Sequence, residues 1–99
     1  MIKASLEWVT ANGGKGAYAQ VDTTKIAVSG QSCGGLEAYD LRADPRIFTI
    51  GIFNSGEFAA ADSKTVAGSI TKPIFYFLGG SSDIAYANVS ISRNCQRTE

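Results

Sequence analysis

The fold of this chain is decided by residues 25–35, whose sequence is KIAVSGQSCGG. The stretch begins with a short apolar segment, 26–29, that is partly β-branched, as expected for a strand buried on both faces of a sheet. It then enters the motif G-x-S-x-G, centred on Ser32, and a helix-compatible segment follows. A strand, a sharp turn and a helix around a central serine are the context of a nucleophile elbow. We therefore expect Ser32 at the carboxyl end of a strand, in a strained backbone conformation, with its hydroxyl pointing outward.

The glycines around Ser32 suit such a turn. An elbow crowds the positions two before and two after its serine, and Gly30 and Gly34 carry no side chain there. Gly35 adds room for the helix to pack against the strand. The competing interpretation is a glycine-rich phosphate-binding loop between a strand and a helix. That loop fits less well, because the chain lacks G-x-G-x-x-G and no Lys-Ser/Thr pair follows the glycines.

With the preceding segment 21–26, VDTTKI, the motif of residues 30–35, GQSCGG, resembles the αβ-hydrolase superfamily. Gln31 and Cys33 occupy the two variable positions of the motif. The chain is most similar to the esterase, lipase and dienelactone-hydrolase-like branches. The resemblance extends over roughly residues 3–92, where the elbow is the specific part and the remainder matches by the order and type of its elements.

This resemblance implies a role for each of three residues. Ser32 would be the nucleophile, and the backbone N–H of Cys33 would donate to the oxyanion hole, whose second donor would come from upstream of residue 1. The triad acid would be Asp83, which stands in a turn rich in glycine and serine just after the third predicted strand. Its carboxylate would fix the histidine tautomer and stabilise the imidazolium.

Other interpretations of these residues stay open. Asp83 could instead cap the next helix. Glu57 and Asp62, after the second predicted strand, are rival acids, because some hydrolases place the acid there. Cys33 could be a nucleophile only at the centre of the motif, which would require a glycine at Gln31. We therefore expect Cys33 to be a small buried side chain beside the elbow.

The 99 residues contain no histidine. A Ser-His-Asp hydrolase needs an imidazole to accept the serine proton and return it to the leaving group. The superfamily order is serine, acid, then histidine, so the absent residue is the one expected last, and the strands expected before the elbow are absent too. We interpret residues 1–99 as one partial αβ-hydrolase domain, running from the nucleophile elbow to the acid turn. The alternative is a relative that has lost catalysis and serves as a binding module.

The rest of the chain alternates between helical and extended patterns, which is typical of an α/β fold. Alternation of this kind gives parallel strands joined by right-handed crossovers, here an incomplete three-layer α/β/α sandwich with about three strands. In such sheets the site lies beyond the carboxyl ends of the strands, where Ser32, Glu57 and Asp83 all fall. The expected helices are 2–12, 34–43, a weak helix or mixed loop at 59–68 and a possible helix at 84–92, and the expected strands are 26–29, 47–53 and 74–78.

Composition limits the partners. Nine acidic and nine basic residues give a net charge of zero, so nothing favours the capture of nucleic acid. No apolar run approaches the roughly 18 residues of a membrane span, and the start lacks the apolar core of a signal peptide. The sequon Asn88-Val89-Ser90 slightly favours secretion. Cys33 and Cys95 are too few to indicate a compartment, and a disulfide between them stays open.

These observations together predict a serine hydrolase that acts on small-molecule carboxylic esters through an acyl-enzyme, with no metal or organic cofactor. A peptidase or amidase of the same fold would use the same machinery, and the sequence does not separate these activities. We expect the isolated chain to be inactive, because it lacks the histidine. We also expect marginal stability, because the two outer strands would expose their edges.

Overall fold

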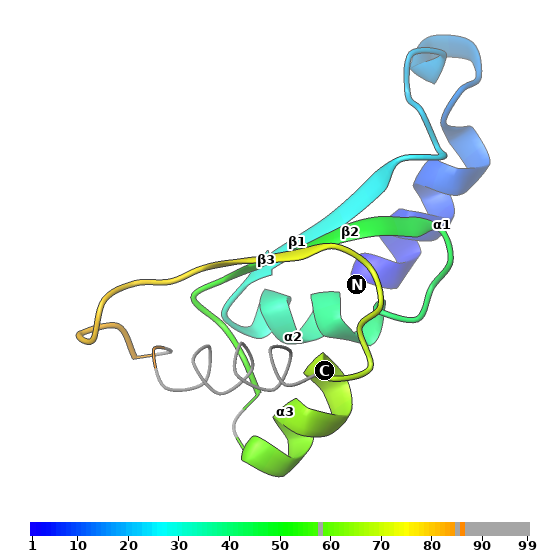
Figure 1. Ribbon diagram of the computed structural model, residues 1–99. Coiled ribbons are helices and arrows are strands. Elements are labelled where there is room, and N and C mark those ends of the chain that lie inside the picture. Colours follow the sequence, from blue (N-terminus) through cyan, green and yellow to red (C-terminus); the bar gives the residue numbers. More distant parts are fainter. Residues whose placement is uncertain (58, 85, 87–99) are drawn as a thin grey trace.

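The computed structural model (Figure 1) describes residues 1–57, 59–84 and 86. The predicted helix at 84–92 lies largely outside these residues, and the Asn88 sequon and Cys95 lie wholly outside them. In chain order the elements are α1 (Ile2–Asn12), the short 3-10 helix η1 (Gly16–Tyr18), β1 (Ile26–Gln31), α2 (Cys33–Asp40), β2 (Ile47–Phe53), α3 (Ala60–Ala67) and β3 (Ile74–Phe77).

The three strands form one parallel sheet in the order β1-β2-β3. The register aligns Val28 with Ile50 and Ile74 in one row across the sheet. Because both connections run in the same direction across the sheet, right-handed crossovers place their helices on the same face. Figure 1 shows α2 and α3 together below the sheet. The parallel α/β arrangement predicted from the alternating pattern is confirmed.

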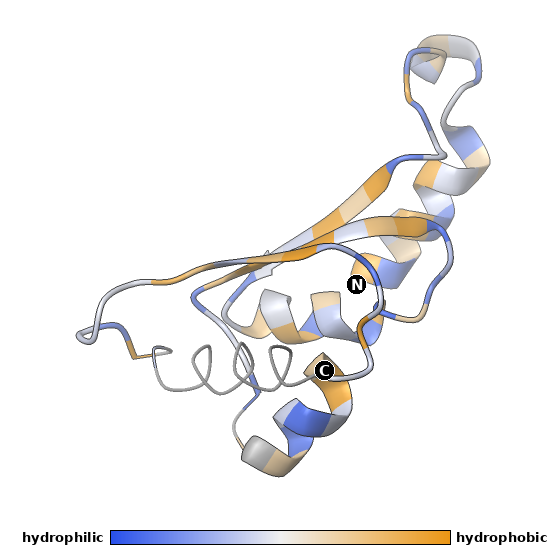
Figure 2. Cartoon of the chain, viewed as in Figure 1, coloured by the Kyte–Doolittle hydropathy of each residue, from blue (hydrophilic) through white to orange (hydrophobic). Residues whose placement is uncertain are grey.

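The core lies between the sheet and α2. The strands direct Val28, Ile50 and Ile52 toward the core, and Ile50 and Ile52 are fully buried. Helix α2 contributes Tyr39 to the same core. Figure 2 shows these strands as largely hydrophobic bands. The Tyr39 hydroxyl forms a hydrogen bond with the hydroxyl of Tyr76 on β3, 3.1 Å away, so the polar end of this buried side chain has a partner.

The opposite face of the sheet is uncovered in the described part of the chain. Phe53, Phe75 and Phe77 alternate with the core-facing residues and are 36%, 50% and 52% exposed. The rings of Phe53 and Phe77 stack with their centroids 4.5 Å apart. The described residues thus form two layers, and the third layer of the predicted sandwich is not found among them, because both crossover helices lie on the other face.

Several element boundaries differ from the predicted ones, by a single residue in β3, at each end of α3 and at the start of α2, and by more at the ends of β1 and α2. β1 continues to Gln31, beyond the predicted end at residue 29, because Gln31 still pairs with Phe53 of β2. α2 ends at Asp40 rather than at 43. The chain tightens there, as the N–H groups of Leu41 and Arg42 donate to carbonyls three residues back. Because β1 ends at Gln31 and α2 begins at Cys33, a single residue separates the strand from the helix.

The two faces of the sheet should respond differently to truncation. Ile50→Ala should lower the free energy of unfolding by about 2–5 kcal/mol, because it leaves a cavity at a fully buried site. Phe75→Ala should cost less than half as much, because Phe75 is already 50% exposed. Urea unfolding of the two variants measures both values. Equal losses would show that the phenylalanine face is covered in solution.

Candidate active site

Ser32 is the single residue between β1 and α2, and its side chain is exposed. Its backbone has φ 53° and ψ −123°. A positive φ is uncommon for residues other than glycine, and holding a residue in such a sparsely populated region costs about 1–3 kcal/mol. The sequence therefore places its central serine in a strained turn at the carboxyl edge of the sheet.

Three hydrogen bonds hold the Ser32 backbone in this conformation. Its N–H donates to the carbonyl of Phe53 at 3.3 Å, so the turn stays attached to β2. Its carbonyl accepts from the N–H of Gly35 at 2.9 Å and from the hydroxyl of Ser55 at 2.5 Å. At about 1 kcal/mol net for each bond, the three together are comparable to the cost of the strain. Without any one of these hydrogen bonds, the remaining two would offset less of the free energy cost of the strained backbone.

The glycines contribute unequally to the turn. A Cβ on Gly30 would overlap the carbonyl of Gly34 and lie 2.6 Å from the nitrogen of Gly35, so no side chain fits there. A Cβ on Gly35 would lie 2.5 Å from the Cβ of Ser55, which makes Gly35 a point of close approach to the segment after β2. A Cβ on Gly34 would meet nothing within 4 Å. The predicted crowding therefore applies at Gly30, whereas the prediction for Gly34 is wrong, because the turn brings the Gly34 backbone onto position 30 and leaves its own Cβ direction open.

Cys33 is the first residue of α2, so its N–H has no acceptor within the helix. The positive end of the helix dipole lies at the same place. This N–H stands next to the exposed Ser32, where an oxyanion donor is required. The side chain of Cys33 is exposed, so the prediction of a buried thiol is wrong, because the residue begins the helix at the edge of the sheet rather than facing the core. Gln31 is exposed as well.

The sequence analysis missed two residues that follow β2, Asn54 and Ser55. Asn54 has φ 42°, its N–H donates to the carbonyl of Phe77, and its side-chain oxygen accepts from the N–H of Gly79 at 2.6 Å. Ser55 is only 4% exposed and donates to Ser32 as described above. Asparagine tolerates the left-handed region better than most residues, and the sequence Asn-Ser-Gly after a strand was the signal that could have revealed this turn.

Asp83 lies in the segment that follows β3 at the carboxyl edge of the sheet. Its side chain packs on Gly79, because a Cβ placed there would lie 2.5 Å from Asp83 Oδ2. Its N–H donates to the carbonyl of Gly80, which closes a turn. A continuous path of contacts therefore runs from Ser32 through Ser55 and Asn54 to Gly79 and Asp83. In Figure 1 the orange segment that follows β3 extends past the ends of the strands, away from the turn that holds the serine.

The rival acids have different surroundings. Glu57 is partly buried, and its pKa is raised first by this burial and then by the neighbouring carboxylates Asp62 and Asp40. A triad acid must be ionised to stabilise an imidazolium, and the raised pKa makes ionisation of Glu57 less favourable than in water. Asp62 lies in the first turn of α3 and is exposed.

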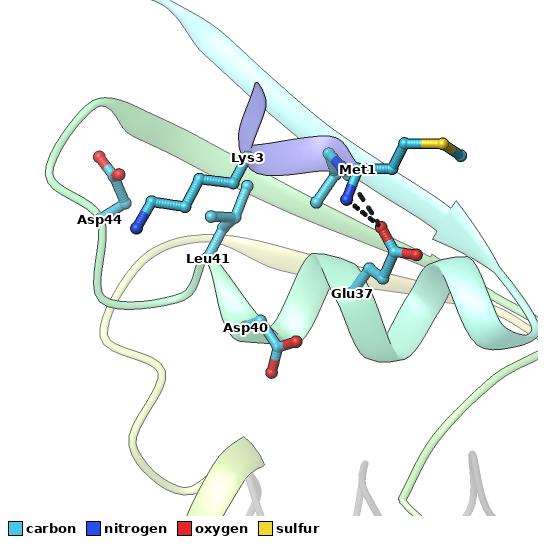
Figure 3. A pocket seen from close by; sticks show the side chains of 7 residues that line it. Met1, Lys3, Glu37, Asp40, Leu41 and Asp44 are labelled. Carbon is cyan, nitrogen blue, oxygen red and sulfur yellow. Dashed lines mark hydrogen bonds and ion pairs between the residues drawn. The ribbon is translucent and has the colours of Figure 1, made fainter. Parts of the chain in front are cut away.

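Two cavities of the described chain lie away from Ser32. Figure 3 shows the larger one, of about 490 Å³, along the carboxyl-terminal half of α2 and therefore at the opposite end of that helix from Ser32. In it the Glu37 carboxylate faces the Met1 amine at 3.7 Å. A groove of about 290 Å³ lies between α1 and β1. The larger cavity is lined by Met1, Ile2, Lys3, Glu37, Asp40, Leu41 and Asp44.

Known proteins do not identify the chain: no protein-family model matches it, and no curated protein or solved structure is significantly similar to it. Among the described residues, no helix combines the length and apolar character needed to cross a membrane. The same residues contain no group of three or more histidine, cysteine or acidic side chains that could hold a metal ion. The geometry around Ser32 is therefore the main indication of a functional site.

Alanine at the two flanking glycines tests this geometry. Gly30→Ala should lower the free energy of unfolding by at least about 2 kcal/mol, because the new Cβ overlaps the Gly34 carbonyl. Gly34→Ala is the matched control and should change stability by less than about 1 kcal/mol, since open space surrounds the new methyl and alanine favours the helix. Chemical denaturation of both variants gives the comparison. A Gly34→Ala variant as unstable as Gly30→Ala would contradict the described turn.

Proposed function

We propose that these residues are part of a serine hydrolase of the αβ-hydrolase superfamily that acts on carboxylic esters. The observation that supports this most is the strained conformation of Ser32, between a parallel strand and a helix. Strained backbones persist where the surrounding structure holds them, and they concentrate at functional sites. The hydroxyl of Ser32 does not cap α2, although the residue stands at the cap position. A serine that is strained, exposed and not used as a cap is best explained as a nucleophile.

In the proposed reaction the Ser32 oxygen attacks the ester carbonyl carbon, and a histidine accepts the hydroxyl proton. The N–H of Cys33 and the dipole of α2 stabilise the negative oxygen of the tetrahedral intermediate. The intermediate expels the alcohol, which takes the proton from the imidazolium, and leaves an acyl group on Ser32. A water molecule, deprotonated by the same histidine, then attacks the acyl carbon, and the acid is released as the Ser32 oxygen takes the proton back from the imidazolium.

The histidine belongs, in this proposal, to a part of the protein outside residues 1–99, since these contain none. In a triad the imidazole lies between the serine and the acid, so these two side chains do not touch each other. We therefore propose that the histidine lies between the turn of Ser32 and the turn of Asp83, which both follow strands of one parallel sheet. The 99-residue chain alone would then not turn over substrate.

A second candidate function is a hydrolase-fold module that binds a partner and has no catalysis. The absence of histidine from the 99 residues favours this candidate. The strain at Ser32 favours the enzyme, because a binding module gains nothing from it. A peptidase or amidase would share every feature described here, so ester hydrolysis is the proposal that follows from the resemblance to the esterase and lipase branches.

Fluorophosphonate labelling of the native protein tests the nucleophile. Trypsin should release the peptide 26–42, which contains Ser29 and Ser32, and fragmentation of this peptide should place the label on Ser32. Ser32→Ala should abolish labelling, whereas Ser29→Ala, which changes an exposed serine in β1, should leave it unchanged. A well-folded native protein that takes no label, or takes it on Ser29, would refute the enzyme proposal.

Substitution of the acids tests the triad. In the complete protein, Asp83→Asn should lower kcat by about 10³–10⁴-fold, because the histidine loses its orientation and charge partner. Glu57→Gln and Asp62→Asn are the controls and should lower kcat by less than about tenfold. Steady-state hydrolysis of a p-nitrophenyl ester measures all three. A larger loss in Glu57→Gln than in Asp83→Asn would move the acid to the segment after β2.

A further inference from the structure

We infer that Asn54 and Ser55 are a pair of positioning residues, through which the central strand fixes the nucleophile turn and the acid turn relative to each other. The inference rests on the proposed function, because it assigns catalytic roles to Ser32 and Asp83. In this inference neither residue of the pair contacts the substrate. Each acts through a hydrogen bond to a neighbouring segment.

Ser55 acts on the nucleophile turn. Its hydroxyl donates to the Ser32 carbonyl at 2.5 Å and lies in a buried position, 4% exposed, where water competes little for the bond. Rotation of the Ser32 carbonyl away from this hydroxyl would require a change in ψ of Ser32. Ser55 also lies against Gly35 in the first turn of α2, so its side chain has little freedom to follow such a rotation. The bond therefore opposes relaxation of the strained serine.

Asn54 acts on the acid turn. Its side-chain oxygen accepts from the N–H of Gly79 at 2.6 Å, and its own N–H donates to the carbonyl of Phe77 at 2.9 Å. These two bonds hold the chain where it leaves β3. Asp83 packs directly on Gly79, so a shift of Gly79 displaces the carboxylate. The positive φ of Asn54 turns the chain here.

The order of the strands explains why these two residues are adjacent. β2 lies between β1 and β3, so the segment after β2 can reach both neighbours. One residue of the pair binds toward the β1 side and the next binds toward the β3 side. The turns that carry Ser32 and Asp83 follow β1 and β3, which do not pair with each other, and one dipeptide thus contacts both turns.

Ser55→Ala tests the first half of the inference in the complete protein. The variant should react with a fluorophosphonate at Ser32 about 10–100-fold more slowly than the wild type, because the nucleophile loses its fixed orientation. Carbon-13 shifts of Ser32, identified as the serine signal that Ser32→Ala removes, should move as well. Ser63→Ala is the matched control: it removes another fully buried serine hydroxyl, in α3, and should leave both readouts unchanged.

Ser55→Cys gives a second variant for the case in which Ser55→Ala does not fold. Cysteine keeps a hydrogen-bond donor at this position, though a weak one. The fluorophosphonate should therefore label Ser32 of this variant at a rate between those of the alanine variant and the wild type. A Ser55→Cys rate equal to that of the wild type, with unchanged Ser32 shifts, would overturn the role of Ser55.

Asn54→Gly and Asn54→Asp test the second half. Glycine permits the positive φ but removes the acceptor, so exchange of the Gly79 amide hydrogen should quicken and hydrolysis of a p-nitrophenyl ester should slow by about tenfold. Aspartate keeps the acceptor oxygen and should preserve both readouts. Equal behaviour of the glycine variant and the wild type would overturn the role of Asn54.

The outcomes separate the inference from the proposed function. A wild-type protein that takes no label on Ser32, but whose Ser32 shifts move in Ser55→Ala, would refute the hydrolase proposal and leave Ser55 as a conformational support. A wild-type protein labelled on Ser32, with Ser55→Ala labelled equally fast and with unchanged shifts, would keep the hydrolase and refute the positioning pair.

Discussion

The strained backbone of Ser32 determines which residues can surround the end of β1. A serine with φ 53° requires partners for its N–H and carbonyl, and it finds them on β2, on α2 and in the segment that follows β2. The turn leaves no room for a side chain at Gly30 or Gly35. It also uses a hydroxyl at Ser55 as a hydrogen-bond donor. One unfavourable conformation thus explains several sequence choices that propensity alone would not.

Local patterns in the sequence predicted the parallel sheet and the place of the serine. The apolar segment 26–29 and the glycine at 30 indicate the place of the serine, because a strand, a turn and a helix in succession form a local pattern. The parallel sheet follows from the alternation of helices and strands along the chain. The roles of Asn54 and Ser55 depend on which strand lies beside which, and so they appear only in the fold. The exposure of Cys33 and the freedom around Gly34 depend on where α2 begins, which its weak helix-starting sequence does not specify.

The predicted third layer shows another limit. Alternation of helices and strands predicts crossovers, but the direction of each crossover decides which face its helix covers. In the order β1-β2-β3 both crossovers run the same way, so α2 and α3 share a face, while Phe53, Phe75 and Phe77 stay exposed in the described chain. The surroundings of Glu57 also depend on the fold: burial and two neighbouring carboxylates raise its pKa, a feature that its sequence position did not reveal.

The proposed function requires that the Ser32 oxygen carries the acyl group during ester hydrolysis. An acid quench of the native protein during turnover of a p-nitrophenyl ester, followed by mass spectrometry of the peptide 26–42, tests this requirement. We expect an acyl adduct on Ser32 that forms before the acid is released and disappears as the acid appears. Hydrolysis without any such adduct, or an adduct on Cys33, would refute a Ser32 nucleophile.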